Sequence, residues 1–284
     1  MIKNEEKMYK SEKVIKHYNE FGEKEWDRLS GTATGRLKFF LHMEFIREFI
    51  KKEMKVLDVG CGAGRFSAEF AKMGAAVTLA DISPGQIDIA KKKFSENNLL
   101  ADDFIVTDLK NMSFENSSFD IVVCYGAALN YLLESTEQGI SELVRVLKPG
   151  GMIFISVVSR WGVQPILFSS MLKDNLAEFL SDPEKNQIYR SVENGDLIQD
   201  ERITHPTRHF FDSKEIKILF ENAGIEKIGF GCAPCIASNR YEAVEEVSES
   251  QKAWETLLYM EKKAFMQPGL VDCGEFLMMR GMKK

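Results

Sequence analysis

The sequence predicts an α/β fold, a doubly wound and mostly parallel sheet with helices on both faces, and three observations support this. Apolar runs of strand length alternate with helical patterns through residues 55–157. These runs are rich in Val and Ile and lack polar alternation, as is typical of parallel strands buried on both faces. The 284 residues are enough for one large domain or two small ones.

Seven segments are predicted to be strands, the first five in the alternating region and the last two after an interruption. They are residues 55–59, 76–80, 103–106, 120–124, 152–158, 225–231 and 275–280. Because strands and helices alternate, and crossovers between parallel strands are right-handed, the strands are expected to form one doubly wound sheet.

Helices are predicted between these strands, and their ends carry recognisable signals. Ser83 is a cap followed by Pro84 at the first helical position, and Gly224 follows the end of a later helix. A Lys-Pro-Gly-Gly turn at 148–151 ends another helix and leads into a strand. The predicted helices are residues 64–73, 84–97, 137–147, 213–223 and 249–266.

Two flanking segments depart from the alternation. Residues 3–51 have helical patterning with an apolar face. Residues 159–204 interrupt the strands with a helix-like stretch at 165–180 and a polar segment after it. These two segments are the candidates for an α-helical lid over the carboxyl edge of the sheet.

Composition limits the classes of function. The net charge is -6, whereas nucleic-acid-binding proteins usually show a basic balance. No apolar run approaches the ~18–20 residues that span a bilayer, and the charged start lacks the apolar core of a signal peptide. We therefore expect a cytoplasmic protein without a membrane partner, and nucleic acid is disfavoured as a partner.

The five cysteines are odd in number and scattered, so reduced thiols are expected rather than a disulfide framework. Cys232 and Cys235 form a lone C-x-x-C pair without a second pair at zinc spacing. A turn with buried thiols at the end of a strand is the favoured interpretation, and no metal site is predicted.

A glycine-rich turn follows the first predicted strand, in the segment Asp58-Val59-Gly60-Cys61-Gly62-Ala63-Gly64. Glycines at alternate positions allow the backbone to approach a ligand closely before a helix begins. A dinucleotide fingerprint would have a small residue at position 65, where this chain has Arg65, and the P-loop pattern is absent. A carboxylate at Asp58 favours a ligand that carries a cation or an amine.

Polar residues also end the next strands, and ligands of open α/β sheets bind at this edge. Asp81 lies 21 residues beyond Gly60, a spacing at which a carboxylate binds ribose hydroxyls, and Ile82 can pack on a base. Asp108 offers an acceptor for an exocyclic amine. Each aspartate alone could be an ordinary turn or cap residue, but three at successive strand ends favour a ligand site.

The motifs together resemble those of class I S-adenosylmethionine-dependent methyltransferases, in a branch that includes small-molecule and ubiquinone-pathway enzymes. The matching segments are VLDVGCGAGRFS, Asp81, Thr107-Asp108-Leu109, SFDIVVCYGA and LVRVLKPGGMIFIS, across residues 36–158. The resemblance implies a Rossmann-like sheet of seven mostly parallel strands with a C-terminal antiparallel strand. It also implies S-adenosyl-L-methionine as the cofactor and S-adenosyl-L-homocysteine as its product.

The resemblance assigns the cofactor-binding roles. The turn from Asp58 to Gly64, with Gly60, Cys61 and Gly62, would hold the amino-acid end of the cofactor. Asp81 would bind the ribose, and Ile82, Thr107, Asp108 and Leu109 would surround the adenine. The strand end at Cys124 and Tyr125 would meet the ammonium group, and Arg36 would reach the carboxylate. An exposed position at the start of a helix is an equally good interpretation of Arg36.

The expected domain is single and spans residues 1–284. It comprises an N-terminal helical lid at 1–35, a cofactor-binding half at 36–158, a lid insertion at 159–207 and the rest of the sheet at 208–284. Acceptor choice is assigned to the two lid segments.

Methyl transfer needs a general base only where the acceptor is protonated, so a catalytic base need not exist. The candidates are His205 and His209, because histidine titrates near neutrality, and Tyr18 on the N-terminal helix. Structural packing of the segment around His209, and a pocket-shaping role for Tyr18, are the competing interpretations.

The predicted function is methyl transfer to an O, N or C atom of a small molecule by in-line displacement. A methyltransferase acting on tRNA or protein is the alternative within the family. A nucleotide- or NAD-binding module without transferase activity is the alternative from another class. The sequence leaves the acceptor and the oligomeric state open.

Overall fold

The computed structural model describes residues 8–171, 181, 187–200, 203 and 205–284. Its main sheet has seven strands in the order β3-β2-β1-β4-β5-β9-β8. The first five strands pair in parallel, and β9 is antiparallel to both of its neighbours, β5 and β8. The predicted Rossmann-like fold with an antiparallel C-terminal strand is therefore confirmed.

The strands agree closely with the apolar runs of the sequence. The largest difference is in β5, which begins five residues before the predicted start because the Lys-Pro-Gly-Gly turn is part of the strand. The strands are β1 Lys55–Val59, β2 Ala76–Asp81, β3 Asp103–Val106, β4 Phe119–Cys124, β5 Leu147–Val158, β8 Ile225–Ala233 and β9 Phe276–Lys283.

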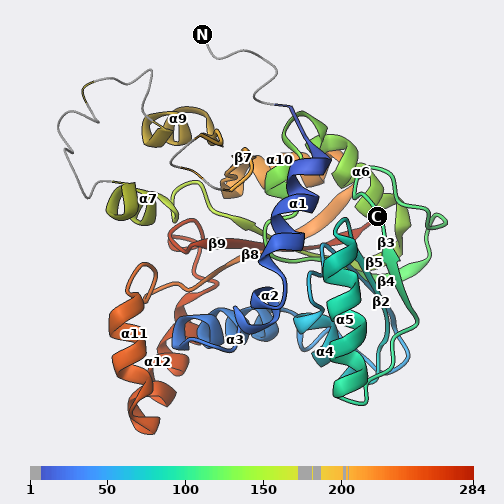
Figure 1. Ribbon diagram of the computed structural model, residues 1–284, viewed down its shortest axis with the longest axis horizontal. Coiled ribbons are helices and arrows are strands. Elements are labelled where there is room, and N and C mark those ends of the chain that lie inside the picture. Colours follow the sequence, from blue (N-terminus) through green and yellow to red (C-terminus); the bar gives the residue numbers. More distant parts are fainter. Residues whose placement is uncertain (1–7, 172–180, 182–186, 201–202, 204) are drawn as a thin grey trace.

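Helices cover both faces of this sheet, with α6 and α10 above it and α3, α4 and α5 below it in Figure 1. They begin and end near the predicted positions because their caps are those in the sequence: Ser83 Oγ accepts from the Gln86 N–H, 3.1 Å away. The bounds are α3 Ala33–Ile46, α4 Arg65–Lys72, α5 Pro84–Glu96, α6 Thr136–Val146 and α10 Ser213–Asn222.

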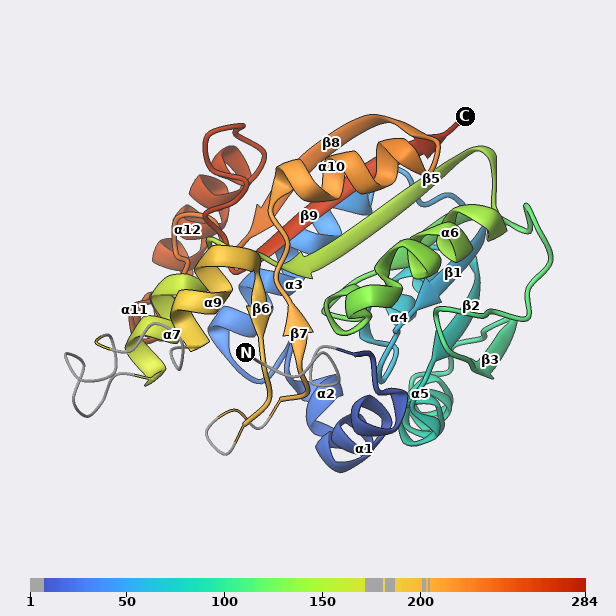
Figure 2. The same cartoon turned by 90° about the horizontal axis from the view of Figure 1, so that it is seen from above.

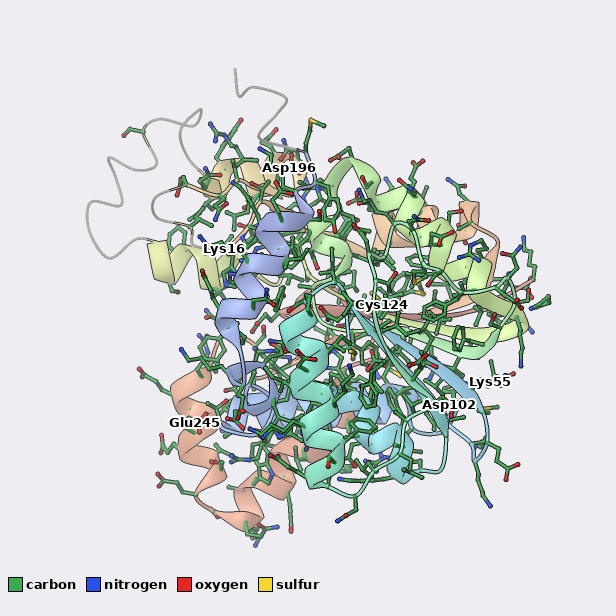
Figure 3. All side chains as sticks on the ribbon, turned by 45° about the vertical axis from the view of Figure 1, so that its right-hand side comes forward. Lys16, Lys55, Asp102, Cys124, Asp196 and Glu245 are labelled. Carbon is green, nitrogen blue, oxygen red and sulfur yellow. The ribbon has the colours of Figure 1, made fainter. Side chains whose placement is uncertain are left out.

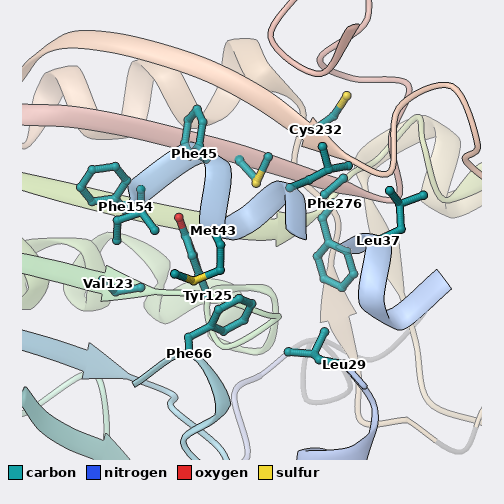
Figure 4. Packing of buried hydrophobic residues seen from close by; sticks show 14 of the residues in the cluster. Leu29, Leu37, Met43, Phe45, Phe66, Val123, Tyr125, Phe154, Cys232 and Phe276 are labelled. Carbon is teal, nitrogen blue, oxygen red and sulfur yellow. The ribbon is translucent and has the colours of Figure 1, made fainter. Parts of the chain in front are cut away.

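Each face of the sheet has its own apolar core. Side chains that alternate along each strand enter opposite cores: Val56 and Val123 face α3 and α4, whereas Leu57 and Val122 face α6. Figure 4 shows Phe45, Phe66, Tyr125 and Phe154 packed in the first core. Because the core strands are buried on both faces, ligand access is confined to the edges and ends of the sheet.

Two short helices and a pair of 3₁₀ turns lie at the carboxyl ends of the strands. The helices are α1 Ser11–Phe21 and α2 Lys24–Asp27, and the 3₁₀ turns span Leu129–Tyr131 and Leu133–Ser135. Figure 2 shows α1 and α2 beside α5, across one end of the sheet. In Figure 3, Cys124 marks this end, and Lys55 and Asp102 mark the opposite end.

Side chains fasten α1 to the start of α5. Asn19 Oδ1 accepts hydrogen bonds from Ser83 Oγ at 2.7 Å and from the Gly85 N–H at 3.1 Å. Gln86 Nε2 donates to the carbonyl oxygens of Tyr18 at 2.9 Å and Gly22 at 3.1 Å. The end of α1 is thus held at a fixed place over the β2–α5 connection.

The other flanking segments contain elements that the sequence did not predict. The helix-like stretch 165–180 contains α7, Gln164–Met171, and its remaining residues lie outside the described ones. After it come α9 (Gln187–Asn194) and a hairpin of β6 (Asp196–Leu197) and β7 (Arg208–His209). The predicted helix 249–266 is α12 (Gln251–Ala264), preceded by an unpredicted helix α11 (Tyr241–Ser248). Across the described residues, no helix has both the length and the apolar character needed to span a membrane.

Candidate functional site

The chain reverses its direction of winding between β1 and β4, and the glycine-rich turn lies at this switch point. Gly60 and Gly62 have φ angles of +69° and +53°, in the left-handed region that favours glycine. A Cβ on Gly60 would stand 2.7 Å from that of Ala128, and one on Gly62 would stand 2.9 Å from Glu25 Cγ. The turn therefore leaves no room for side chains where the neighbouring segments approach it.

Asp81, the last residue of β2, organises this turn. Its Oδ2 accepts from the Gly62 N–H at 2.9 Å, and its Oδ1 accepts from the Ser83 N–H at 2.8 Å. Burial raises the pKa of Asp81 to about 6, against the opposing effect of these N–H groups. A carboxylate has about four lone-pair sites, so it can accept further hydrogen bonds from a ligand.

Asp58 plays a different part. It is 2% exposed, and its Oδ2 accepts from Ser67 Oγ of α4 at 2.5 Å. Burial raises its pKa to about 7. Asp58 is not among the residues that line the cleft described next, so its contact fastens the turn to the first helix after it.

A cleft of about 670 Å³, part of it open solvent, lies between the carboxyl ends of β1–β4 and helices α1 and α2. Glycines and apolar side chains form most of its floor, and polar side chains come from the two helices and from the strand ends. The lining residues are Tyr9, Val14, Tyr18, Glu25, Arg28, Val59, Gly60, Gly62, Asp81, Ile82, Thr107, Leu109, Tyr125, Gly126, Ala127, Ala128, Tyr131 and Leu132.

Several predicted cofactor residues meet in this cleft. Its lining includes Gly60, Gly62, Asp81, Ile82, Thr107, Leu109 and Tyr125. Four other predicted residues, Asp58, Cys61, Gly64 and Cys124, belong to the turn or to the end of β4 but do not line it. Asp108 does not line the cleft, but its Oδ2 accepts from the Tyr9 hydroxyl at 3.2 Å. It therefore helps to hold Tyr9, a lining residue just before α1.

Arg36 lies elsewhere. It is exposed on α3, and its guanidinium stands 5.5 Å from the centre of the Trp254 ring of α12. The arginine at the cleft is Arg28, whose Nη2 donates to Glu25 Oε1 at 2.6 Å. The expectation for Arg36 is therefore corrected, because the chain bends between α2 and α3 and turns only the earlier arginine toward the glycine-rich turn.

Tyr18 and Tyr131 join the lid helix to the 3₁₀ turn after β4. The Tyr18 hydroxyl donates to the Tyr131 hydroxyl at 3.4 Å. Burial, followed by the neighbouring Tyr131, raises the pKa of Tyr18 well above its usual range. Tyr18 stays protonated at neutral pH, so its hydroxyl can hold a hydrogen bond but the prediction of Tyr18 as a general base is corrected.

His209 is also corrected as a candidate base. Its Nδ1 lies 2.8 Å from Asp196 Oδ1, and its Nε2 lies 3.0 Å from Glu215 Oε1. These carboxylates outweigh burial and raise the pKa of His209 to about 9. A protonated ring has no free lone pair, so His209 is a structural cation between β6 and α10.

His205 is neutral but does not line the cleft. Burial, with smaller effects from Arg208 and His17, lowers the pKa of His205 to about 4. Its ring centre lies 4.7 Å from that of His17, and its buried Nδ1 has no hydrogen-bond partner in the described part of the chain.

The C-x-x-C pair lies away from this site, at the end of β8. Cys232 and Cys235 are 0% and 7% exposed, and all five cysteines are free thiols. Nearby, Glu261 accepts from the N–H groups of Cys235 and Ala237 at 2.8 and 2.7 Å. Among the described residues, no group of three or more potential ligands could hold a metal ion.

Sequence reasoning missed Tyr9, Glu25, Arg28 and Tyr131 as components of one site. The available signal was the density of polar and aromatic residues in the first 30 positions, but their spacing matches no motif. Their convergence depends on how α1 and α2 fold back over the sheet.

Known proteins share both the motifs and the fold. Residues 56–151 match the family model described as a methyltransferase domain. The chain is 30% identical over 174 residues to the mitochondrial ubiquinone biosynthesis O-methyltransferase of Schizosaccharomyces pombe, covering 58% of this chain and 60% of that protein. It is 36% identical over 107 residues to the ubiquinone biosynthesis O-methyltransferase of Xanthomonas oryzae pv. oryzae, covering 37% and 44%.

The matched region thus spans 60% or less of these relatives' own lengths. Solved structures are similar over more of the chain. A possible histamine N-methyltransferase from Thermotoga maritima has a TM-score of 0.57 at 18% identity, covering 94% of this chain and 98% of that one. Phosphoethanolamine N-methyltransferase 2 of Haemonchus contortus has a TM-score of 0.52 at 18% identity, covering 94% and 60%. At these identities the likeness concerns the fold.

Proposed function

We propose that this chain, which carries a class I S-adenosylmethionine-dependent methyltransferase domain, transfers a methyl group from that cofactor to a small-molecule acceptor. One observation carries the proposal: the glycine-rich turn, Asp81 and the apolar residues after β2 and β3 line a single cleft that α1 and α2 close. Open α/β sheets bind their ligands at this edge and at this switch point.

The residues of the cleft fit the cofactor group by group. Asp81 would accept the ribose hydroxyls, and Ile82 and Leu109 would enclose the adenine between apolar side chains. The absence of side chains at Gly60 and Gly62 leaves backbone atoms to face the cofactor. These assignments use only residues that line the cleft.

The Glu25–Arg28 pair suits the amino-acid end of the cofactor. The side chains are 14% and 34% exposed, and both line the cleft next to Gly62. A zwitterion offers an ammonium group and a carboxylate, which a Glu–Arg pair matches with charges of the opposite sign. We therefore assign Arg28 to the carboxylate, in the role first expected for Arg36.

When bound, the cofactor supplies an already activated methyl group on a sulfonium. The chain's own residues then have to hold the acceptor in line and exclude water. Helices α1 and α2 exclude water, since Val14 and Tyr18 of α1, Glu25 of α2 and the preceding Tyr9 line the cleft. The hydroxyls of Tyr18 and Tyr131 can orient an acceptor by hydrogen bonding.

A small acceptor fits this enclosure better than a macromolecule does. Side chains of α1 and α2 form one wall of the cleft, so the strand ends are not open to a large flat surface. Two relatives bear the name ubiquinone biosynthesis O-methyltransferase, and the proposed acceptor is likewise a small molecule.

Calorimetry on the full chain tests the proposal first. Titration with S-adenosylmethionine and S-adenosylhomocysteine is expected to show one site for each, and NAD is expected not to bind. Binding of NAD in preference to both would contradict the proposal. Transfer from methyl-labelled cofactor is then measured with a panel of small molecules and with bulk tRNA. If the label appears in tRNA and in none of the small molecules, the acceptor is RNA and the proposal of a small acceptor is wrong.

A further inference from the structure

A second cavity adjoins the cofactor cleft. It has a volume of about 590 Å³, including open solvent, and lies between α1 and the residues that directly follow β6 and directly precede β7. Val14 and Tyr131 line both the second cavity and the cleft, so these two side chains lie at the boundary between them. The lining residues are Met8, Lys10, Lys13, Val14, Tyr131, Ile198, Gln199, Pro206 and Thr207.

The described residues that line this cavity carry charge of one sign. Lys10 and Lys13 line it, and no acidic residue is among the described residues that do. Lys13 Nζ donates to Gln199 Oε1 at 2.9 Å, an uncharged partner. Gln199 N–H in turn donates to Thr207 Oγ1 at 3.1 Å, so the residues that follow β6 and those that precede β7 are joined at this cavity.

The described acidic residues that lie close to the cavity in sequence include Glu12, Glu134 and Asp200, and none of them lines it. Asp200 follows Gln199, and its Oδ1 and Oδ2 accept from the Ile203 N–H at 3.0 Å and Gln187 Nε2 at 3.2 Å. Glu134 lies three residues after Tyr131, and its Oε2 accepts from the Tyr9 N–H at 2.8 Å. Neither contact supplies an anion to Lys10 or Lys13.

A third cationic side chain, that of Arg208, belongs to the residue next to the cavity lining. Arg208 follows the lining residue Thr207, and its buried Nε has no hydrogen-bond partner in the described part of the chain. After burial itself, Arg208 is the largest influence that lowers the pKa values of both His17 and His205. The positive charge of Arg208 therefore reaches α1 and the segment that lines the cavity, and it adds to that of the two lysines.

We propose that the second cavity binds the methyl acceptor and that the acceptor carries an anionic group, a carboxylate or a phosphate, held by Lys10 and Lys13. The inference rests on the proposed function, since it takes the neighbouring cleft as the cofactor site. Tyr131 lies between the two cavities. The reactive end of the acceptor therefore extends past Tyr131 into the cofactor cleft, and its anionic group stays in the second cavity with the lysines. Lys10 and Lys13 are specificity-determining residues, distant from the reacting atoms.

Calorimetry on the full chain, saturated with S-adenosylhomocysteine so that the cofactor cleft is filled, tests the inference. The probes share an aromatic ring and differ in charge: phenyl phosphate, benzoate, benzyl alcohol and benzylamine. The two anions are expected to bind more tightly than the neutral and cationic probes, and the tighter of the two identifies the group. Anion affinity is expected to fall as sodium chloride is raised.

The variant Lys10→Gln/Lys13→Gln keeps side-chain length and removes both charges. It is expected to weaken binding of the anionic probes about tenfold, because hydrogen bonds to charged groups are the strong ones. Lys16→Gln is the matched control, since Lys16 lies on the same helix and is 76% exposed. The control is expected to bind as the unmodified chain does.

The outcomes separate the inference from the function on which it rests. If S-adenosylhomocysteine does not bind the unmodified chain, the proposed function fails. If it binds with equal affinity to all three proteins, the cofactor site is intact. In that case, anions that bind no better than benzyl alcohol, that fail to bind at millimolar concentration, or that are unaffected by the double substitution would overturn the inference alone.

Discussion

At the scale of single residues, Asp81 combines a structural and a ligand-binding duty. It holds the glycine turn through the Gly62 N–H and the start of α5 through the Ser83 N–H. Its pKa of about 6 means that the carboxyl group ionises only as pH rises toward neutrality. Below this value, a protonated oxygen has lost part of its capacity to accept hydrogen bonds from a ribose.

We therefore predict that the affinity for S-adenosylhomocysteine rises with pH through about 6. Asp81→Asn is expected to lower this affinity at pH 8 by about tenfold and to flatten its pH dependence. Calorimetry between pH 5.5 and 8 provides the measurement. Asp88→Asn, on an exposed part of α5, is the control and should retain the affinity. An unchanged profile in Asp81→Asn would remove Asp81 from the site.

Arg28 and Arg36 allow a direct comparison. Arg28 lines the cleft and pairs with Glu25, whereas Arg36 is exposed against Trp254. Arg28→Gln is expected to weaken binding of S-adenosylhomocysteine about tenfold, because a charged partner for the carboxylate is lost. Arg36→Gln is expected to leave it unchanged. The reverse result, measured by calorimetry on both variants, would restore the assignment made from sequence.

His209 predicts a pH dependence of stability. Its folded pKa of about 9 lies above the ordinary 6.5, so the folded state binds this proton more tightly than the unfolded chain does. Its stabilisation is fully present below about pH 6.5 and is lost as pH rises through about 9. A shift of this size corresponds to roughly 3 kcal/mol at most, with the side chain 17% exposed.

His209→Gln is therefore expected to destabilise the protein more at pH 6.5 than at pH 9.5. Urea unfolding of both proteins at the two pH values measures the difference. Equal destabilisation at both values would mean that the ring contributes by packing alone.

Residue positions at strand ends could be predicted, and positions in the lid could not. Asp81, Ile82 and Leu109 follow apolar runs whose ends are visible in the sequence, and all three line the cleft. His209 was a candidate base because histidine titrates near neutrality. Its ion pairs could not be predicted, since Asp196 and Glu215 are 13 and 6 residues away and share no motif with it. Arg28 and Tyr131 are 103 positions apart, and only the folded chain brings them to one cleft.

At the scale of elements, the attachment of α1 to α5 decides whether the cleft is closed. Gln86 is fully buried, and its side-chain amide supports the carbonyl oxygens of Tyr18 and Gly22. Those oxygens belong to the end of α1 and also accept from the N–H groups of Gly22 and Glu25, at 3.2 Å each, so the Gln86 amide adds a contact that joins them to α5. Removing the amide therefore frees the end of α1 without touching the strands.

Gln86→Ala is expected to weaken binding of S-adenosylhomocysteine and to speed proteolysis within α1. The substitution removes two buried hydrogen bonds of about 1 kcal/mol each, so the free energy that holds α1 over the cleft is expected to fall by roughly 2 kcal/mol. Gln138→Ala is the control, because Gln138 Nε2 also donates to a carbonyl oxygen, that of Lys110, but on the exposed surface of α6. If α1 is cleaved no faster in Gln86→Ala than in the control, other contacts hold the helix.

Long elements were predicted well because each contains enough residues to show a period. The helix α5 has a cap, a proline and an apolar face, and the strands of the core have unbroken apolar runs. The strands β6 and β7 have two residues each, too few for any pattern. The helix α11 buries only Val244, so its apolar signal is weak.

At the scale of the whole molecule, the lid and the sheet have separable duties. The two apolar cores lie on the faces of the sheet, and α1 contributes one buried apolar side chain, Val14, which belongs to neither. The same helix supplies Val14 and Tyr18 to the cleft and Lys13 to the second cavity. Helix α1 therefore contributes few side chains to the cores and several to the linings of both cavities, and we expect it to affect ligand binding more than folding.

Deleting residues 1–22 tests this division, because it removes α1 and keeps α2, with Glu25 and Arg28. The shortened chain is expected to keep the circular dichroism signal of the remaining elements and to melt cooperatively, since it keeps every buried residue of both cores and loses only Tyr9 from their margins. Its affinity for S-adenosylhomocysteine is expected to fall about tenfold or more, as one wall of the cleft is lost and water enters. A chain that fails to fold would make α1 part of the core, and a chain that binds as before would show that α1 does not close the site. The predicted result, a folded sheet with a weakened site, would assign the fold to the strands and the closure of the cleft to the N-terminal helix.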